Sequence, residues 1–456
     1  MTNHSHGERL RPPWSRSDRR LPKLVVRPVQ RFLNTEASGG LMLLAAAVVA
    51  IIWANSPWSD SYERIWHARI NLELGPWGLT QDLRHFINDA LMSIFFFVVG
   101  LEIKREFVAG ELRDPRTASL SFFAAFGGMV VPALLYLWIT QGGEGSNGWG
   151  IPMATDIAFA VGVLAIAGKG LPAGPRLFLL SLAIVDDIGA ILVIALFYSQ
   201  GIDGRALAVG AALVILIASL QRAQVRATAI YVVLGTIVWV AVFQSGVHAT
   251  IAGVVLGLLT PARPFYTSKG VSEEARHVAD RTPEDSVPSD VEAAEWLWLA
   301  GIAREAVSPL TRLEHALHPW TSFVIVPLFA LANAGVILTG EALDRSLSSR
   351  VTLGIVAGLV AGKIIGITLG AWLGVFLKLA RLPRAMRWPH LIAVAAVAGV
   401  GFTVSLFIAD LAFRQEELLE AAKVGVLAAS ILAGVLGSGL LLMVKRPRSR
   451  GQEAPT

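Results

Sequence analysis

One apolar run constrains this chain more than any other stretch, because it is long enough to cross a membrane and yet contains two adjacent acids. Residues 177–198 read LFLLSLAIVDDIGAILVIALFY, with Asp186 and Asp187 at the centre. A membrane-spanning helix needs about 20 mostly apolar residues. A carboxylate at the centre of the bilayer costs roughly 2.5 to 3.5 kcal/mol on insertion scales. Two such costs in one helix indicate that each carboxylate has a partner or a function.

The two carboxylates must face different surroundings. Consecutive residues of a helix lie about 100° apart around the axis, so the side chains of Asp186 and Asp187 cannot point at the same place. One of them can meet a fixed partner while the other faces a cavity.

The composition indicates a polytopic membrane protein. Of the 456 residues, 54% are hydrophobic and 16% are charged. Basic residues lie in the tails and between apolar runs, where membrane orientation accounts for them, so the net charge of +5 does not indicate nucleic-acid binding. The chain has no cysteine, which excludes disulfides and thiolate metal sites.

Apolar runs predict about twelve transmembrane helices in an all-α fold. Lys and Arg gather after the second, fourth, sixth, tenth and twelfth runs, which places these loops and both termini in the cytoplasm. The runs cover residues 39–54, 89–107, 118–139, 151–167, 177–198, 206–220, 228–243, 247–259, 321–338, 351–377, 390–413 and 421–444.

The domain organisation follows from these runs. We expect a membrane domain over residues 39–446, preceded by a basic cytoplasmic tail over 1–38 that composition predicts to be disordered. A cytoplasmic tail over 447–456 follows. An acidic, proline-containing insertion over 265–295 is also predicted to be disordered.

The first outer loop predicts a small periplasmic β-hairpin. In residues 68–80, Ile70, Leu72 and Leu74 alternate with polar residues before a Gly-Pro-Trp-Gly turn. An exposed hairpin edge is suited to pairing with a second copy of the chain. A plain surface turn explains the pattern equally well.

Two predicted spans are interrupted. Pro152 and Gly162 flank Thr155 and Asp156 in the fourth span, and glycines such as Gly399 stand beside hydroxyl side chains in the eleventh. The fourth span is the middle one of spans 3 to 5, and the eleventh is the middle one of spans 10 to 12. Interruptions at matching positions of two such sets indicate inverted repeats, whose broken helices cross at the membrane midplane beside an ion site. Packing alone is the alternative, because Gly and Pro are common in membrane helices.

A buried base accompanies the acids. Lys363 lies at the centre of the tenth span, and pairing with Asp186 or Asp187 would lower its cost. A purely structural network with Asp156 is the alternative. Three acids against one base leave surplus negative charge, which favours a cation site, and carboxylate and hydroxyl oxygens suit small hard cations. A carboxylate that binds either a cation or a proton makes the two compete, which at an alternately exposed site is exchange.

Eight motifs together resemble the bacterial NhaA-type sodium/proton antiporter family from about residue 36 to residue 444. They are NDALMSIFFFVVGLEIKRE (88–106), GWGIPMATDIAFAVGVLA (148–165), LAIVDDIGAI (182–191), SGVHATIAGV (245–254), LEHALHPW (313–320), LFALANAGV (328–336), AGKIIGI (361–367) and GVGFTVSLFIADLAF (399–413).

The resemblance implies a fold and an activity. It implies inverted repeats, a multi-pass position in the bacterial inner membrane, and a homodimer joined partly by the 68–80 hairpin. It also implies electrogenic exchange of Na⁺ or Li⁺ for protons, with pH regulation.

The resemblance further assigns residues. Asp187 is implied as the principal Na⁺ ligand, with Asp186 as the partner of Lys363 and Thr155 with Asp156 as the polar pair of the broken fourth helix. Na⁺ is thus expected on Asp187, Asp186 and Thr155. The other matching positions are Asp89, at the start of the second span, and a cytoplasmic-side cluster linked in the family to pH regulation: Glu102, Glu106, Glu314, His315 and His318.

The last cluster has some support of its own, because Glu102 and Glu106 are four residues apart on one helix, as are Glu314 and His318. Histidine titrates near physiological pH. Solvated or ion-paired side chains at helix ends are the alternative. Asp410 adds a charge to the eleventh span, and the resemblance assigns it no role.

Two other classes compete with antiport. A passive cation channel also places carboxylates in the membrane, but it needs a continuous polar lining, whereas the polar residues here concentrate at one depth. A proton-conducting subunit of a respiratory complex is the second. We expect no enzymatic activity, because no nucleophile and base stand in a recognisable arrangement, and the sequence predicts no cofactor.

Overall fold

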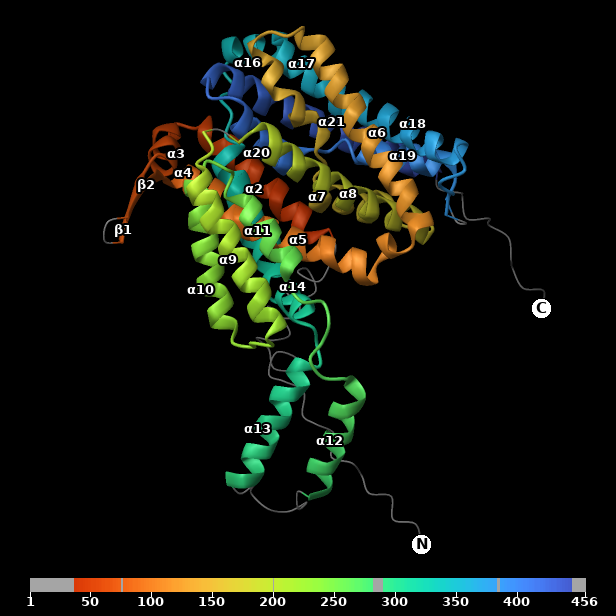
Figure 1. Cartoon of the computed structure of the whole chain (residues 1–456). Coiled ribbons are helices and arrows are strands. Elements are labelled where there is room, and N and C mark those ends of the chain that lie inside the picture. Colours follow the sequence, from red (N-terminus) through yellow and green to blue (C-terminus); the bar gives the residue numbers. More distant parts are fainter. Residues whose placement is uncertain (1–36, 75–76, 200, 282–289, 384–385, 445–456) are drawn as a thin grey trace, which may run out of the picture.

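The computed structural model describes residues 37–74, 77–199, 201–281, 290–383 and 386–444. These residues are almost entirely helical (Figure 1). The helices of the first half are α2 Ser38–Ala54, α3 Ser59–Trp66, α4 Leu83–Phe86, η3 Ile87–Leu91, α5 Met92–Ala109, η4 Glu111–Arg113, α6 Pro115–Thr140, η5 Glu144–Met153, α7 Ile157–Ala167, α8 Ala173–Phe197, α9 Gly204–Arg222, α10 Thr228–Gln244 and α11 Thr250–Leu259. Those of the second half are α12 Ser268–Arg281, α13 Asp290–Glu305, α14 Pro309–Trp320, η6 Thr321–Ile325, α15 Val326–Asn333, α16 Gly340–Ser348, α17 Arg350–Val356, η7 Ala357–Gly362, α18 Lys363–Phe376, α19 Trp388–Val397, α20 Phe402–Ala412 and α21 Glu416–Val444.

Seven helical segments of the described chain are long and apolar enough to cross a membrane, and up to ten if each bent pair of helices is one span. Two shorter apolar helices, α10 and α11, complete the set. Each of the twelve predicted runs overlaps one of these helices. Length and composition therefore support a multi-pass membrane protein with seven to ten crossings.

Three of the long segments contain a π-helical turn. These turns are η3, η6 and η7, and the last ends directly before Lys363. A π-turn adds a residue to one helical turn and shifts the faces that follow it, and such turns are frequent at functional sites.

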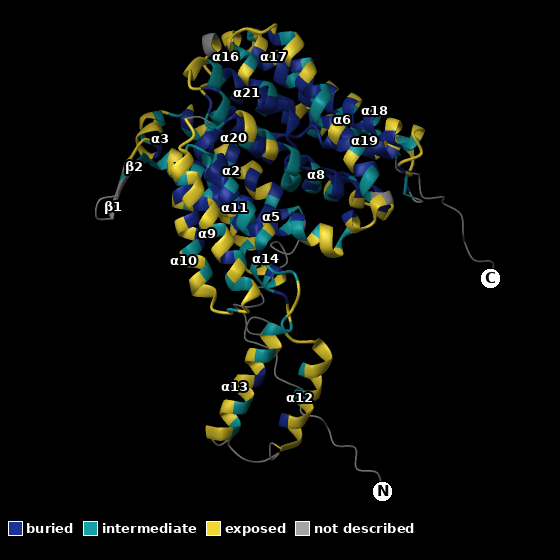
Figure 2. Cartoon of the chain, in the orientation of Figure 1, coloured by how far each residue is buried: buried dark blue, intermediate teal, exposed yellow. Residues whose placement is uncertain are grey.

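Large apolar side chains cover much of the outside. In α9, only 11% of an 18-residue apolar stretch is buried, and Ile215 is 65% exposed. Figure 2 shows α9 and α10 largely exposed, whereas α8 and α20 lie inside. In water such a surface would aggregate, so it indicates contact with lipid chains.

Small residues let the helices around α8 approach closely. The helices α6 and α18 pack against each other along their length. A Cβ atom added to Gly366 would lie 2.2 Å from the backbone oxygen of Gly127. Only glycine fits this contact, which fixes α18, and with it Lys363, against α6.

Two antiparallel strands lie between α3 and α4. Arg69–Leu74 (β1) pairs with Trp77–Asp82 (β2), with Arg69 opposite Asp82. They project from the helices in Figure 1. Residues 75 and 76 lie outside the described residues. The periplasmic location and the role in a homodimer stay predictions.

The segment predicted as a disordered insertion contains helices. The prediction covers 265–295, whereas α12 occupies Ser268–Arg281 and α13 begins at Asp290. The two helices contact each other and bury Val278 and Leu299, a packing that the polar composition of the segment did not indicate. The predicted tails lie, apart from residues 37–38, outside the described residues, as do residues 282–289.

Candidate functional site

The two interrupted helices meet at their breaks. The first bends by 47° between η5 and α7, and the second by 50° between α19 and α20. Asp156 N donates a hydrogen bond to Val400 O at 2.7 Å, and Thr155 Oγ1 donates to Ala398 O at 2.8 Å. Backbone groups that each break leaves without a helical partner are thus satisfied by the other break, as an apolar environment requires.

Asp156 caps two helices at once. Its Oδ1 accepts a hydrogen bond from Phe159 N at 3.0 Å, at the start of α7. Its Oδ2 accepts hydrogen bonds from Thr403 N at 3.0 Å and Thr403 Oγ1 at 2.6 Å, at the start of α20. A helix N-terminus carries roughly half a positive charge. The negative charge of Asp156 is therefore offset by the two helix ends that it joins.

Asp186 is neutralised by a base from the neighbouring helix. Lys363 Nζ lies 2.6 Å from Asp186 Oδ2, and each side chain has 1% of its surface exposed. The other oxygen, Asp186 Oδ1, is buried and accepts no hydrogen bond from the described residues. The Thr155 hydroxyl interacts with this carboxylate, yet it donates its hydrogen to Ala398 O. Asp186 Oδ1 and Thr155 Oγ1 therefore each keep a lone pair that can bind a cation.

Asp187 is the uncompensated acid. No described residue forms a hydrogen bond or a close ion pair with its carboxylate. The carboxylate interacts electrostatically with four charged groups: Asp186, Glu102, Asp156 and Lys363. Asp187 is buried: 6% of the surface of the whole residue is exposed, compared with 2% for the whole of Asp186. With Asp186 paired and Asp156 shared between two helix ends, the surplus negative charge of the site is localised on Asp187.

Acids of α5 and α14 form one cluster around Arg105. Arg105 pairs with Glu314, and its guanidinium lies 3.9 Å from Glu106. Glu102 interacts with these three side chains and also with Asp187. The cluster is therefore electrostatically linked to the aspartates of α8.

The two histidines of α14 lie at the edge of this cluster. His315 and His318 are exposed, and His318 interacts with Glu314 and Arg105. A charge on either histidine therefore acts on the cluster at its solvent side.

Asp89 lies on the same helical segment as Glu102, far from it along the axis. It and Glu102 stand near opposite ends of the Leu83–Ala109 segment, about 20 Å apart along the axis at 1.5 Å per residue. Its Oδ2 accepts a hydrogen bond from Gln81 Nε2 at 3.2 Å, and it interacts electrostatically with His85, His248 and Asp410.

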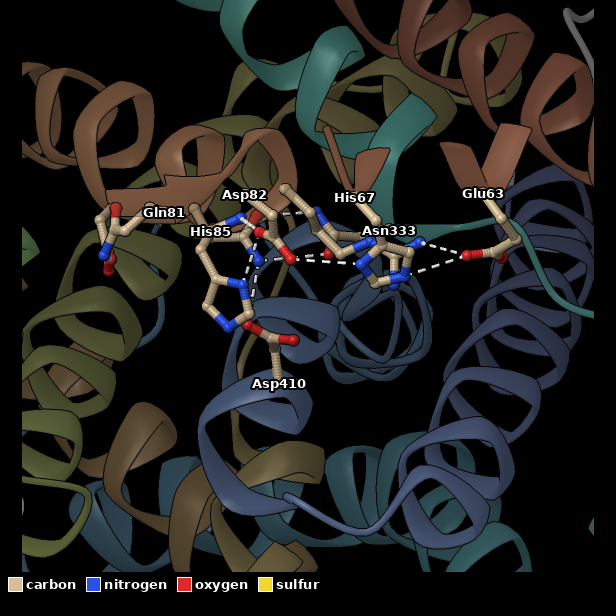
Figure 3. A network of polar contacts seen from close by, with 10 residues as sticks. Glu63, His67, Gln81, Asp82, His85, Asn333 and Asp410 are labelled. Carbon is tan, nitrogen blue, oxygen red and sulfur yellow. Dashed lines mark hydrogen bonds and ion pairs between the residues drawn. The ribbon is translucent and has the colours of Figure 1, made fainter. Parts of the chain in front are cut away.

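Two buried asparagines, which the sequence did not single out, connect this end of the Leu83–Ala109 segment to α20. Asn333 Nδ2 donates to Asn88 Oδ1 at 2.8 Å, and Asn88 Nδ2 donates to Asp410 Oδ2 at 2.9 Å. Asn333 and Asp410 are labelled in Figure 3. The available signal was an amide side chain inside the 321–338 run and another directly before the 89–107 run.

A histidine-carboxylate cluster fastens the strands to the neighbouring helices (Figure 3). His67 lies between Glu63 and Asp82, at 3.1 and 3.2 Å, and His85 Nδ1 lies 2.6 Å from Asp82. Burial alone would raise the pKa of Asp82, but hydrogen bonds from His85 and His67 lower it below the ordinary value of 3.8.

Comparison with known proteins places the chain among transporters. The family model described as Na⁺/H⁺ antiporter 1 matches residues 30–441. The Na⁺/H⁺ antiporter NhaA 2 of Sorangium cellulosum is 46% identical over 442 residues, which covers 96% of this chain and 94% of that protein. The antiporter NhaA 2 of Acidiphilium cryptum is 48% identical over 92% of each chain. The NhaA of Rhodopirellula baltica is 47% identical over 91% of this chain and 94% of that protein. The chain therefore belongs to the Na⁺/H⁺ antiporter 1 family, a family of multi-pass membrane transporters and not of enzymes.

Proposed function

We propose that this chain is an electrogenic secondary antiporter that exchanges Na⁺ or Li⁺ for H⁺ across the bacterial inner membrane. The observation that carries the proposal is the carboxylate of Asp187, which forms no hydrogen bond or close ion pair with the described residues and lies on α8, a helix in contact with η5, α7 and α19. The names of the curated relatives support Na⁺ and H⁺ as the transported ions.

Competition follows from burial. An unneutralised carboxylate in an apolar environment is unfavourable in free energy. Asp187 should therefore be occupied either by a cation or by a proton. The free lone pairs of Asp186 Oδ1 and Thr155 Oγ1 offer the cation two further oxygen ligands. Because one carboxylate serves both ions, release of protons accompanies binding of Na⁺, and the reverse.

Alternating access completes the cycle. We propose that α7 and α20, which begin at the shared cap on Asp156, shift together so that the site opens to one side of the membrane and then to the other. The Asp186–Lys363 pair is a second ionisable group in the site, so more than one proton can cross for each cation. That inequality makes the exchange electrogenic.

The topology belongs to the proposal. It has twelve crossings in inverted repeats, both termini and the α12–α13 pair in the cytoplasm, and β1 and β2 in the periplasm. Two copies form a homodimer joined partly by these strands. The membrane domain spans residues 39–446, between cytoplasmic tails over 1–38 and 447–456.

Regulation by pH is assigned to the cluster of Glu102, Glu106, Glu314, His315 and His318. Its support is the link from Glu102 to Asp187 and the ion pair of Glu314 with Arg105. Protonation of the histidines adds positive charge beside Glu314, which changes the field at Asp187 through Glu102.

Reconstituted vesicles test the proposal. An imposed proton gradient, reported by a pH-sensitive dye, should collapse on addition of Na⁺ or Li⁺ to vesicles that contain the wild-type chain, and the response to K⁺ should be measured beside it. A clamped membrane voltage should change the rate if exchange is electrogenic. Antiport is wrong if Na⁺ leaves the proton gradient intact while ²²Na⁺ still crosses, which is the behaviour of a passive channel.

A further inference from the structure

The helix α13 presents a large apolar surface outside the membrane-spanning helices. Three consecutive side chains are exposed: Trp296 by 41%, Leu297 by 75% and Trp298 by 53%. Val291, one and a half turns earlier, is 71% exposed. Figures 1 and 2 show α12 and α13 projecting beyond the ends of α9, α10 and α14, with α13 mostly exposed. Contiguous exposed apolar surface of this kind marks an interaction site.

Contacts with the connection between α9 and α10 hold the base of the α12–α13 pair, and with it the exposed surface of α13, in place. Arg226, from the connection between α9 and α10, lies over the Phe265 ring at 4.7 Å and donates to Tyr266 Oη at 3.2 Å. Its guanidinium is 2.5 Å from Glu305, and Phe265 N donates to Glu305 O at 3.1 Å. The exposed face is therefore presented by an anchored element.

Charge decides which partner fits α13. The helix has four acidic residues and one basic residue. Helices that lie on a membrane surface are rich in Lys and Arg on the polar face, because the cytoplasmic leaflet is anionic. An acidic helix is repelled by that surface, and it is also repelled by the same helix of a second copy. A partner that is both apolar and basic fits.

The chain itself contains such a partner. Residues 1–36 hold eight basic and three acidic residues. Within them, the stretch RRLPKLVVR over 19–27 interleaves its basic residues with apolar ones. Arg side chains stack on tryptophan rings as well as pairing with carboxylates.

The start of α2 faces the same end of the molecule as the α12–α13 pair. A Cβ atom at Gly39 would lie 3.6 Å from Ser322 in η6, and Asn55, at the end of α2, bonds Val336 O at 2.7 Å. The helix α2 thus runs in the direction of α15, and its first residue points back along α14. The α14 helix is about 18 Å long at 1.5 Å per residue. Thirty-six extended residues reach about 120 Å, so the distance is easily spanned.

We propose that residues 19–27 dock on the exposed face of α13, with Leu297 and the two tryptophans as the apolar contact and Asp290 and Glu295 as the counter-charges. The site is an intramolecular one between the basic N-terminal segment and the α12–α13 pair. It is independent of the transport site and of the proposed exchange.

Cross-linking in the full-length chain tests the contact, because the chain has no cysteine of its own. Ser17→Cys is combined with Ala300→Cys on α13 and treated with a short bismaleimide. The control pairs Ser17→Cys with Ala223→Cys, an exposed alanine at the end of α9. We expect about tenfold faster cross-linking within one chain for the first pair, because docking raises the local concentration of the thiol.

Two further variants separate docking from chance encounter. Leu297→Ser with Trp298→Ser should reduce the rate to that of the control pair. Arg19→Glu with Arg20→Glu should do the same, and adding Asp290→Arg with Glu295→Arg should restore it. Rising salt should slow cross-linking.

Three outcomes overturn the proposal. The first is equal rates for the two cysteine pairs. The second is cross-linking that joins two chains, which assigns the face to a second copy. The third is Leu297→Cys that reacts freely with a soluble maleimide in detergent and is protected only in anionic vesicles, which assigns the face to lipid.

Discussion

Lys363 Nζ lies 2.6 Å from Asp186 Oδ2 with both side chains 1% exposed, so this base is committed to one aspartate and leaves the adjacent one uncompensated. That asymmetry gives the neighbours different roles. Asp186 belongs to a buried ion pair, and Asp187 is the group that we propose as the ligand of the transported ion.

Asp187→Asn should abolish Na⁺-dependent exchange while the protein stays folded. An amide is isosteric with the carboxylate but cannot carry the charge that a cation or a proton neutralises. The measurement is Na⁺-driven collapse of a proton gradient in vesicles, with the thermal midpoint as the check on folding. Asp410→Asn is the matched control and should keep exchange, because Asp410 bonds Asn88 and lies outside the group of Asp156, Asp186, Asp187 and Lys363. Retained exchange in Asp187→Asn would remove Asp187 from the ion site.

Lys363→Ala should destabilise the protein by about 3 to 5 kcal/mol, because removing one member of a buried pair leaves an uncompensated charge. Combining Lys363→Ala with Asp186→Asn should recover part of that loss, since neither position of the pair then holds an unpaired charge. Thermal unfolding of the two single variants and the double variant measures the coupling. Additive losses would contradict a direct energetic link. A changed pH profile of exchange in Lys363→Ala would further indicate that the lysine carries a proton.

Thr403→Val should cost about 1.5 to 3 kcal/mol, because it removes a buried hydrogen bond to the Asp156 carboxylate while keeping the side-chain shape. Thr228→Val, at the exposed start of α10, is the control and should change stability little. Thermal unfolding in detergent gives both values. Equal small losses would mean that the Thr403 hydroxyl does not hold the two breaks together.

Gly366→Ala should lower folded yield and stability, because its Cβ would lie 2.2 Å from Gly127 O and force α6 and α18 apart. Gly439→Ala, in α21, meets nothing within 4 Å and should be neutral or stabilising by about 0.5 to 1 kcal/mol. Monodispersity and thermal midpoint of the two purified variants provide the comparison. Similar behaviour of both would show that the α6–α18 contact tolerates expansion.

The Asp82 contacts should make stability depend on acid pH. Because the pKa of Asp82 is lowered in the folded chain, its contribution is complete above the ordinary carboxyl pKa and is lost as pH falls through the lowered value. Wild type should therefore be more stable than Asp82→Asn above about pH 4, and the difference should shrink as the pH falls below the ordinary carboxyl pKa. Thermal midpoints across pH 3 to 7 test this. A constant difference over that range would exclude ionisation of Asp82 as the cause.

The sequence by itself determined the membrane class, the positions of the apolar helices and the residue types of the site. These follow from local properties: the length of apolar runs, the cost of Asp186, Asp187 and Lys363 in lipid, and the helix-breaking chemistry of Pro152 and Gly399. The family resemblance supplied which aspartate pairs with Lys363, and the 2.6 Å contact with Asp186 shows that pairing in the fold. Helices within the 265–295 insertion were missed, because composition does not register the contact that buries Val278 and Leu299.

Only the tertiary structure decided which groups meet. The hydrogen bond of Asp156 N to Val400 O and the double cap on α7 and α20 join residues about 250 positions apart, and no local pattern encodes such contacts. The same holds for the Asn88–Asp410 bond and for the link between Glu102 and Asp187. The apolar runs predicted an expensive pair of acids in one helix. Helix packing assigned the counter-charge to Asp186 and left Asp187 without one, because Lys363 Nζ lies against the Asp186 carboxylate.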